Sequence, residues 1–287
     1  MKEINECPVC HGTKFKDYLE VEDHFGSKES FQLKQCTSCE TLSTNPQPNV
    51  EEIIPYYKSN NYISHGDSVN PVFDLAYKTV QRQNLQYKKK LIEKYTLGKN
   101  LLDYGCGAGS FPHFMQCKGW QVTGIEPDDS AKNQALSKGI NVVELSNLKE
   151  EFDCISLFHV LEHVHDLDTT LHKLISHLSK NGVLVLALPN YQSYDAKHYL
   201  NHWAGYDIPR HLYHFNQKSM YSLAKGFGLN IVSTHPLKFD SYYVSLLSEK
   251  YKNGKSNLFN AFRIGYKSNS KAKRTKEYSS LIYILSK

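Results

Sequence analysis

Three glycines, each separated by one residue, follow a short apolar run that ends in an acid, and this stretch constrains the chain more than any other. Residues 101–111 read Leu-Leu-Asp-Tyr-Gly-Cys-Gly-Ala-Gly-Ser-Phe. The pattern predicts a buried strand at 100–104, a tight turn, and a helix that begins near Gly109. Glycine allows the positive φ that such a turn needs and lets a ligand approach bare backbone. The unpaired N–H groups at the helix start suit a polar ligand.

The motif differs from the dinucleotide pattern G-x-G-x-x-G, because Gly109 comes one residue too early and the acid Asp103 lies on the strand. An acid here would oppose a pyrophosphate but would suit a ligand with a cationic end. The stretch resembles the first motif of the class I S-adenosylmethionine (SAM)-dependent methyltransferases. That resemblance implies that SAM binds beside Asp103 and the turn residues Gly105, Cys106, Gly107 and Gly109.

A second acid, Glu126, ends the predicted strand 120–125. An acid about twenty residues beyond a glycine turn can accept hydrogen bonds from both ribose hydroxyls of a nucleotide. SAM and NAD share that ribose, so Glu126 does not discriminate between them. The resemblance also includes Pro127 in the cofactor site. Many relatives carry a further acid after the third strand to bind the adenine amine, but here Ser146 and Asn147 follow it.

After the predicted strand 152–158, the sequence His-Val-Leu-Glu-His-Val again resembles this family. The resemblance implies that a backbone carbonyl of Phe158 or His159 accepts a hydrogen bond from the SAM ammonium. A hydroxyl or acidic-carbon acceptor would need a general base, for which histidine is suited at neutral pH. The candidates, with a slight preference for the first, are His163, His211, His159 and His214. The alternative is that His163 only packs on a helix and that no protein base is needed.

Alternating strands and helices predict an α/β fold with a parallel, doubly wound sheet. The expected strands are 100–104, 120–125, 141–145, 152–158, 182–188, 229–235 and 279–285. The family resemblance implies a Rossmann-like sheet of seven strands, with the last strand antiparallel between strands five and six. A helix at 73–97 is expected to lead into this sheet, with Lys88, Lys89 and Lys90 on its outer side.

Two C-x-x-C pairs near the N-terminus predict a metal site. Four thiolates satisfy tetrahedral Zn²⁺, and so small a fragment has too little core to fold without a metal. We therefore expect a structural zinc ribbon at residues 1–45, the alternative being free cysteines or a redox pair. The ligands would be Cys7, Cys10, Cys36 and Cys39. The other three cysteines are scattered, which favours a reducing compartment.

The remaining chain divides into a linker with a helical lead-in at 46–98 and a methyltransferase core at 99–287. Residues 190–215 hold seven aromatic residues and four histidines, and we expect them to form a lid over the acceptor. The alternative is a packed aromatic loop whose histidines only form hydrogen bonds with the backbone. Within this segment, Pro-Arg-His-Leu-Tyr-His-Phe resembles a motif of a methyltransferase subgroup that includes sugar C-methyltransferases. By the same resemblance, Tyr57 or Tyr62 would border the cofactor pocket.

Positive charge is concentrated near the C-terminus. Residues 250–276 contain nine Lys or Arg and no acid, so the remainder of the +5 chain carries about −4 (5 minus 9). This stretch belongs to an insertion expected at 238–277, which could bind a phosphate-bearing substrate or a membrane surface. A solvated loop is the alternative. Because charge is balanced over the ribbon, a nucleic-acid partner is not indicated.

The composition, 40% hydrophobic and 22% charged, is typical of a soluble globular protein. No apolar run approaches the ~20 residues of a membrane span, and no signal core begins the chain, so we expect a cytoplasmic protein. The function predicted is SAM-dependent methyl transfer to a small-molecule or sugar-like acceptor. The alternatives are a non-catalytic SAM-binding protein whose ribbon docks a partner, and an NAD-dependent oxidoreductase. The oligomeric state is left open.

Overall fold

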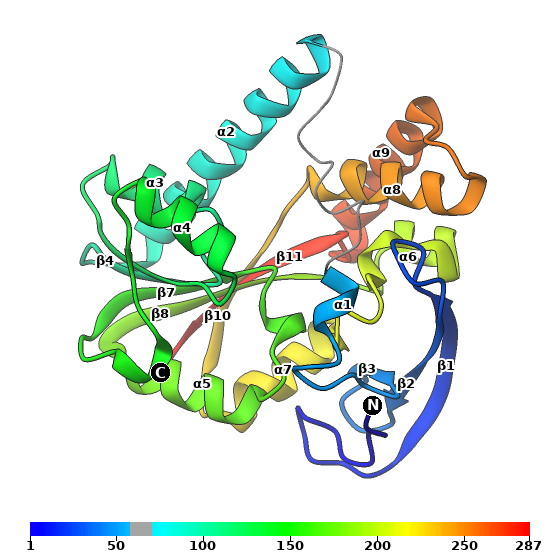
Figure 1. Cartoon of the computed structure of the whole chain (residues 1–287), viewed down its shortest axis with the longest axis horizontal. Coiled ribbons are helices and arrows are strands. Elements are labelled where there is room, and N and C mark those ends of the chain that lie inside the picture. The colour runs from blue at the N-terminus through cyan, green and yellow to red at the C-terminus, as the bar shows by residue number, and fades with distance from the viewer. Residues whose placement is uncertain (58–70) are drawn as a thin grey trace.

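Two β-sheets organise the protein, and the larger one carries the predicted nucleotide-binding edge (Figure 1). The computed structural model describes residues 1–57 and 71–287, with the backbone alone described at 71–78. The larger sheet has seven strands in the order β10-β11-β8-β7-β4-β5-β6. In chain order these are β4 (Asn100–Tyr104), β5 (Gln121–Ile125), β6 (Asn141–Val142), β7 (Phe152–Phe158), β8 (Leu178–Pro189), β10 (Asn230–Pro236) and β11 (Ser280–Ser286).

The direction of the strands confirms the predicted α/β sheet. β11 pairs antiparallel with both β8 and β10, so that the last strand is inserted between strands five and six. The other pairings are parallel. β7 and β8 lie at the centre and are apolar almost throughout, as parallel strands covered on both faces must be. Their buried residues include Ile155, Leu157, Leu184, Val185 and Leu186.

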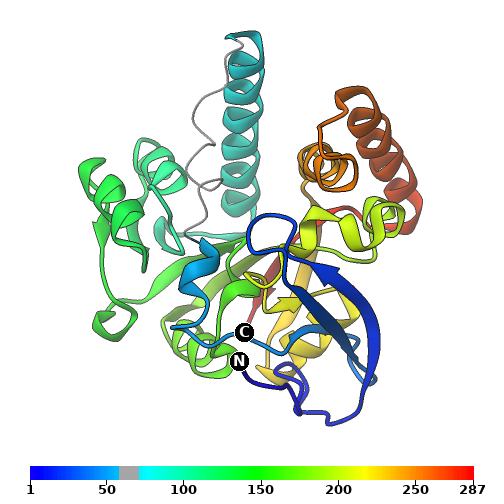
Figure 2. The same cartoon turned by 45° about the vertical axis from the view of Figure 1, so that its right-hand side comes forward.

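Helices cover both faces of this sheet (Figure 2). They are α2 (Pro71–Tyr95), α3 (Ser110–Gln116), α4 (Asp129–Ser137), α5 (Leu167–Ser176) and α7 (Gln217–Gly226). On one face, Ile92 of α2 and Met115 of α3 pack with Val185. On the other face, Leu174 of α5 packs with Leu184, the neighbour of Val185 along β8. Because successive side chains of a strand point to opposite faces, the two clusters form separate layers of core.

The third strand is shorter than expected. The prediction covered residues 141–145, but β6 contains only Asn141 and Val142, which pair with Thr123 and Gly124 of β5. The chain then turns into a short 3₁₀ helix over Leu145–Asn147. At the edge of a sheet only one side of a strand is paired, so little holds the chain extended there.

The second sheet contains three N-terminal strands and one strand from far along the chain. β1 (Phe15–Glu22), β2 (Ser30–Cys36) and β3 (Leu42–Asn45) form antiparallel pairs, and β9 (Tyr213–His214) completes the order β1-β2-β3-β9. Leu42 pairs with His214, and Ser43 pairs with Tyr213. The N-terminal module is therefore continuous with the segment that was expected to be a lid.

That segment, residues 190–215, forms a packed wall between the two sheets. It contains α6 (Tyr194–Tyr199) and two 3₁₀ turns, η4 (Leu200–His202) and η5 (Ala204–Tyr206). Six of its seven aromatic side chains are buried, namely Tyr191, Tyr199, Trp203, Tyr206, Tyr213 and Phe215. Burial of such large aromatic rings contributes a large share of the stabilising free energy of a core. The Trp203 indole N–H also donates to Asp195 at 2.8 Å, so even the polar atom of the ring is bound inside.

The basic insertion folds as a pair of helices rather than as a solvated loop. α8 (Asp240–Asn253) and α9 (Leu258–Thr275) lie together at one end of the molecule (Figures 1 and 2). They approach closely at Gly265, whose carbonyl accepts a hydrogen bond from Ser241 Oγ at 3.2 Å. Among the described residues, no helix combines the length and apolar character needed to cross a membrane.

Candidate functional site

The glycine turn after β4 has the backbone that the sequence predicts. Gly105, Gly107 and Gly109 all have positive φ, at 74°, 52° and 75°. A Cβ on Gly105 would lie 2.5 Å from the Val160 side chain, so this position has no room for another residue. The N–H groups of Gly105 and Cys106 donate to the carbonyl of Ile125 at 2.8 and 3.0 Å. These two N–H groups hold the turn against β5, and they are therefore not free to bind a ligand.

Glu126 is fixed beside this turn by two backbone hydrogen bonds. Its Oε2 accepts from the Gly107 N–H at 2.7 Å, and its Oε1 accepts from the Asp128 N–H at 3.0 Å. Because β4 and β5 run parallel and Asp103 pairs with Gly124, the carboxylates of Asp103 and Glu126 leave the same edge of the sheet. This is the edge at which open α/β sheets bind ligands.

Asp103 is a buried acid whose pKa is set by opposing effects of burial and of its neighbours. It is 4% exposed, and its Oδ1 accepts a hydrogen bond from Ser156 Oγ at 2.6 Å. Burial raises the pKa of Asp103 to about 7, although the Ser156 hydrogen bond and the charge of Lys88 oppose the rise. A carboxyl poised near neutral pH will ionise readily when a cation is placed beside it.

Lys88 lies beside Asp103, which corrects the expectation that it lies on the outer side of its helix. Its Nζ is 3.8 Å from the ring centroid of Phe158, and its charge acts on Asp103 and Asp240. Burial lowers the pKa of Lys88. Lys88 follows Leu85 by three residues and precedes Ile92 by four, so it shares their apolar helix face. This spacing could have predicted that the Lys88 side chain points towards the sheet. The run of three lysines favoured a solvent-facing position instead.

His159 begins the segment after β7 and is held between two acids. Its backbone has a φ of 58°, and its N–H donates to the carbonyl of Ala187 at 2.9 Å. Its ring nitrogens lie 3.2 Å from Asp240 Oδ2 and 3.6 Å from Glu162 Oε1. Burial alone would lower the pKa of His159, but the two carboxylates raise it to about 9. A histidine that is protonated at neutral pH is not suited to act as the base.

The two preferred histidines lie together, although 48 positions separate them in the sequence (211 minus 163). His163 ends the 3₁₀ turn η3 (Leu161–His163), and His211 lies in the aromatic wall. Their ring centroids are 4.6 Å apart, at an interplanar angle of 77°. His163 Nδ1 also lies 3.0 Å from the hydroxyl of Tyr57, at the end of α1 (Ile54–Tyr57). The other tyrosine considered, Tyr62, lies outside the described residues.

The histidines of the wall differ in their surroundings. Burial, followed by the neighbouring His163, lowers the pKa of His211 to about 4, so this ring is neutral. Burial also lowers the pKa of His214 well below its ordinary range. The His214 Nε2 lies 3.4 Å from Thr44 Oγ1 inside the N-terminal sheet. His214 is thus a packing residue on β9, whereas His211 faces the site.

Two of these groups, His159 and His211, line a cavity of about 460 Å³. The ribbon, the aromatic wall and α8 all contribute to its lining, which includes Phe25, His159, Asp207, Arg210, His211, Asp240, Tyr243 and Tyr251. Arg210 is not available to a ligand, because it donates to Asp23 at 2.9 Å, to Asp207 at 2.8 Å and to the Tyr56 carbonyl at 3.1 Å. It ties the ribbon to the wall, and its buried ion pairs hold the cavity together.

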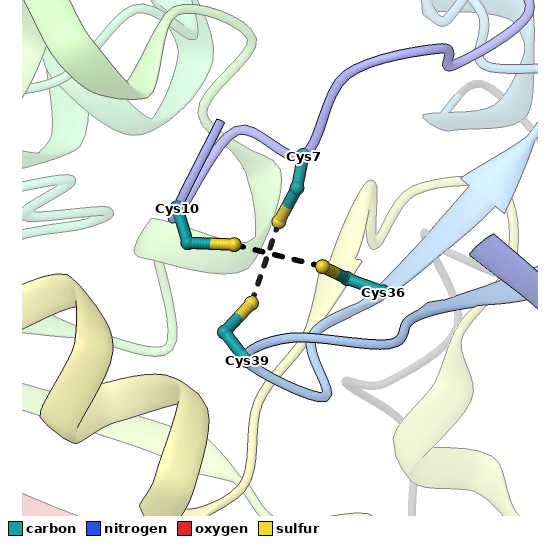
Figure 3. Close-up of side chains that lie close together, drawn as sticks. All are labelled: Cys7, Cys10, Cys36 and Cys39. Atoms are coloured by element: carbon teal, nitrogen blue, oxygen red, sulfur yellow. Dashed lines mark hydrogen bonds between the residues drawn. The ribbon is translucent and has the colours of Figure 1, made fainter. Parts of the chain in front are cut away.

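The four N-terminal cysteines converge on one point (Figure 3). The sulfur atoms of Cys7 and Cys39 are 3.4 Å apart, and those of Cys10 and Cys36 are 3.5 Å apart. The two turns have matching geometry: the N–H four residues after the first cysteine of each pair donates to that cysteine's carbonyl, at 2.9 and 3.0 Å. Four sulfurs presented by two such turns are compatible with a zinc site.

Comparison with known proteins assigns the class. The family described as "Methyltransferase domain" matches residues 77–234, more than half of the chain, and the protein belongs to that family.

Particular relatives match a shorter region. An enzyme named ubiquinone biosynthesis O-methyltransferase from Salmonella paratyphi A is 31% identical over 105 residues, covering 32% of this chain and 43% of that protein. The Haemophilus ducreyi protein of the same name is 34% identical over 109 residues, covering 32% of this chain and 46% of its own. The chain thus spans less than half of the length of these relatives.

A solved structure agrees with the fold over most of the chain. It is the magnesium protoporphyrin IX methyltransferase of Synechocystis PCC 6803, with a TM-score of 0.50 and 14% identity. The match covers 84% of this chain and 99% of that one. At this identity the similarity concerns the fold alone.

Proposed function

We propose that the protein transfers the methyl group of SAM to a hydroxyl-bearing small molecule. The observation that carries this proposal is the pairing of Asp103 and Glu126 on neighbouring strand ends, beside the positive-φ glycine turn. The family match supports it. The earlier third glycine and the acid on β4 continue to disfavour a nicotinamide cofactor.

Three charged side chains would hold the donor. Glu126, oriented by the Gly107 and Asp128 N–H groups, is suited to accept hydrogen bonds from the ribose hydroxyls. Asp103 would face the ammonium group, where a positive charge stabilises its ionised form. Lys88 is a cation beside Asp103 and would pair with the carboxylate of the methionine moiety. SAM itself would supply an electrophilic methyl group on its sulfonium.

The acceptor would occupy the cavity between His159, His211 and α8. Its lining is aromatic and acidic, and Arg210 is already paired, so a neutral hydroxyl compound fits it better than a phosphate ester. The relatives named O-methyltransferases favour an oxygen acceptor. Holding the acceptor oxygen in line with the methyl group would supply much of the rate, because methyl transfer is a displacement that depends on alignment.

His163 and His211 would act on the acceptor proton. His211 Nδ1 lies 3.1 Å from a backbone carbonyl, and His163 Nδ1 lies 3.0 Å from both a backbone carbonyl and the Tyr57 hydroxyl. The Nε2 atoms are therefore the candidates for accepting a proton from the acceptor hydroxyl. His163 remains the preferred residue, and its assignment as base is part of the proposal.

We further propose that Zn²⁺ occupies the four-cysteine site and has a structural role. Four thiolates would fill the tetrahedral shell of Zn²⁺ and leave no open position, which is typical of structural sites. The ribbon also supports the cavity, since Thr44 Oγ1 donates to the His211 carbonyl at 2.7 Å.

Binding and turnover test this function separately. Tryptophan fluorescence titrations should show saturable binding of SAM and S-adenosylhomocysteine and none of NADH. Release of S-adenosylhomocysteine should then be followed across phenols, quinols and sugars with free hydroxyls. Binding of NADH in place of SAM would overturn the assignment, and SAM binding without release on any acceptor would favour a non-catalytic SAM-binding protein.

A further inference from the structure

One carboxylate in the site has no hydrogen-bonding partner among the described residues, and the proposed function assigns it no role. Glu162 is 1% exposed, and neither of its side-chain oxygens accepts a hydrogen bond from any residue that the structure describes. The nearest cation is His159, whose Nδ1 is 3.6 Å from Glu162 Oε1, which is too long for a hydrogen bond. A buried carboxylate in this state costs free energy unless another group completes its shell.

Two further imidazoles face this carboxylate. Ligand atoms of Glu162, His163 and His211 all lie within 4.8 Å of one another, and Glu162 Oε1 is 4.0 Å from His211 Nε2. One carboxylate and two imidazoles therefore converge from η3 and from the aromatic wall, two parts of the chain that meet only in the folded protein. Asp207 Oδ2, 4.0 Å from the same His211 nitrogen, adds negative charge.

The hydrogen bonds of both rings leave the nitrogen that a metal requires. A carbonyl oxygen can only accept, so the Gly205 contact places the hydrogen of the neutral His211 ring on Nδ1. Nδ1 of His163 lies 3.0 Å from both the Arg210 carbonyl and the Tyr57 hydroxyl, and metal binding through Nε2 uses the tautomer in which this Nδ1 donates to the carbonyl. In the neutral ring, Nε2 then carries a lone pair. Histidines that bind metals usually donate their other N–H to a carbonyl or carboxylate in just this way.

We infer that Glu162, His163 and His211 bind a divalent transition-metal ion, in a second metal site distinct from the four cysteines. Two imidazoles and one carboxylate suit ions such as Fe²⁺, Mn²⁺ or Zn²⁺, and three ligands leave positions open for another molecule. The cation would complete the shell of Glu162. It would also balance the acids that surround the cavity, where Arg210 is already neutralised by Asp23 and Asp207.

The chemical consequence rests on the proposed methyl transfer. A metal in this site would bind the acceptor hydroxyl oxygen and lower its pKa, so that the proton is released to solvent. The resulting oxygen anion would form the new C–O bond while the S–CH₃ bond breaks and sulfur keeps the electron pair. The two histidines would then act as metal ligands and not as the base.

The site can be tested with Mn²⁺, whose EPR signal weakens when the free ion is bound. The full-length protein is first loaded with one Zn²⁺ per chain, which Mn²⁺ will not displace from thiolates. The wild-type protein should bind one further equivalent of Mn²⁺. Glu162→Gln and His163→Ala should each weaken that binding by roughly tenfold or more. His165→Ala and Glu144→Gln serve as matched controls, because His165 bonds to the Pro48 carbonyl and Glu144 pairs with Lys132 outside the cluster.

The outcomes separate this site from the proposed function. Circular dichroism of each variant confirms folding, and His163→Ala, at a partly exposed position, keeps the test valid if Glu162→Gln does not fold. If the wild-type protein binds no second ion, or if both cluster variants bind Mn²⁺ as the controls do, the inference fails and Glu162 is only the counter-ion of His159. If protein that holds only the cysteine-bound zinc still releases S-adenosylhomocysteine, methyl transfer stands and the proposed role of the second metal is wrong. If the protein binds Mn²⁺ but methylates no acceptor, the metal site stands and the proposed methyl transfer is wrong.

Discussion

The N-terminal ribbon and the carboxyl edge of the large sheet both gather side chains with ligand chemistry, but they do so in opposite ways. In the ribbon, four cysteines come from two short turns, and each sulfur lies beside another sulfur. At the sheet edge, Asp103 is buried with a raised pKa, and Glu162 lacks a hydrogen-bonding partner among the described residues. A site whose four ligand groups all come from two local turns is suited to support the fold. A buried carboxylate that lacks a hydrogen-bonding partner is suited to bind a ligand. Substitutions in the ribbon should therefore lower stability, and substitutions at the edge should lower binding.

The largest effect is expected in the ribbon. Cys36→Ser should remove the metal and cost several kcal/mol of stability, because zinc binding in such modules is coupled to folding. Thermal melting and zinc content per chain measure this. Cys117→Ser is the control, since Cys117 is exposed and lies in the core domain. If Cys36→Ser melts as Cys117→Ser does, the ribbon is not held by metal and the contrast between the two regions is lost.

At the edge, Asp103→Asn should weaken SAM binding by about 100-fold while leaving the fold intact. The neutral amide can still accept the Ser156 hydrogen bond, but it cannot pair with the ammonium group. Isothermal titration with SAM gives the affinity, and a melting curve gives the stability. Equal SAM affinity in variant and wild type would contradict the assignment of Asp103.

The same variant predicts a pH dependence. The ordinary pKa of the group is 3.8, and burial raises the pKa of folded Asp103 to about 7. Between these values the folded protein keeps a proton that the unfolded chain has lost, so this group's contribution to stability falls as pH rises towards 7. Asp103→Asn has no carboxyl to ionise, so it does not lose stability in this way. Its stability relative to wild type should rise by on the order of 2 kcal/mol between pH 5 and pH 7, as measured by denaturant unfolding. A constant difference would show that the pKa is not raised.

The smallest effect is expected for Lys88→Met, which keeps the aliphatic length but removes the charge. SAM affinity should fall by about tenfold, as expected for one charged hydrogen bond. Stability should change little, because the half-buried amine has lost part of its hydration. Lys90→Met, on an exposed position of the same helix, is the control. If both variants bind SAM equally well, Lys88 does not contact the donor.

The sequence predicted what depends on short spacing or on strand order. The two C-x-x-C pairs indicated the cysteine cluster, and Asp103 and Glu126 were expected together because neighbouring parallel strands end at one edge. Other features depend on contacts between distant segments. The Arg210–Asp23 ion pair joins residues 187 positions apart, and no local pattern announces it. Glu162 has no distinguishing feature within its motif, because its lack of a hydrogen-bonding partner among the described residues emerges only from the folded structure.

Strand β9 has a consequence for how this chain can be rearranged. The ribbon sheet is completed by Tyr213 and His214, and the Thr44 N–H donates to the Leu212 carbonyl at 3.0 Å. The N-terminal module is therefore not an interchangeable cassette. A chimaera that replaces residues 1–45 with the ribbon of another protein would have to bring its own matching β9, or leave an unpaired edge beside His211.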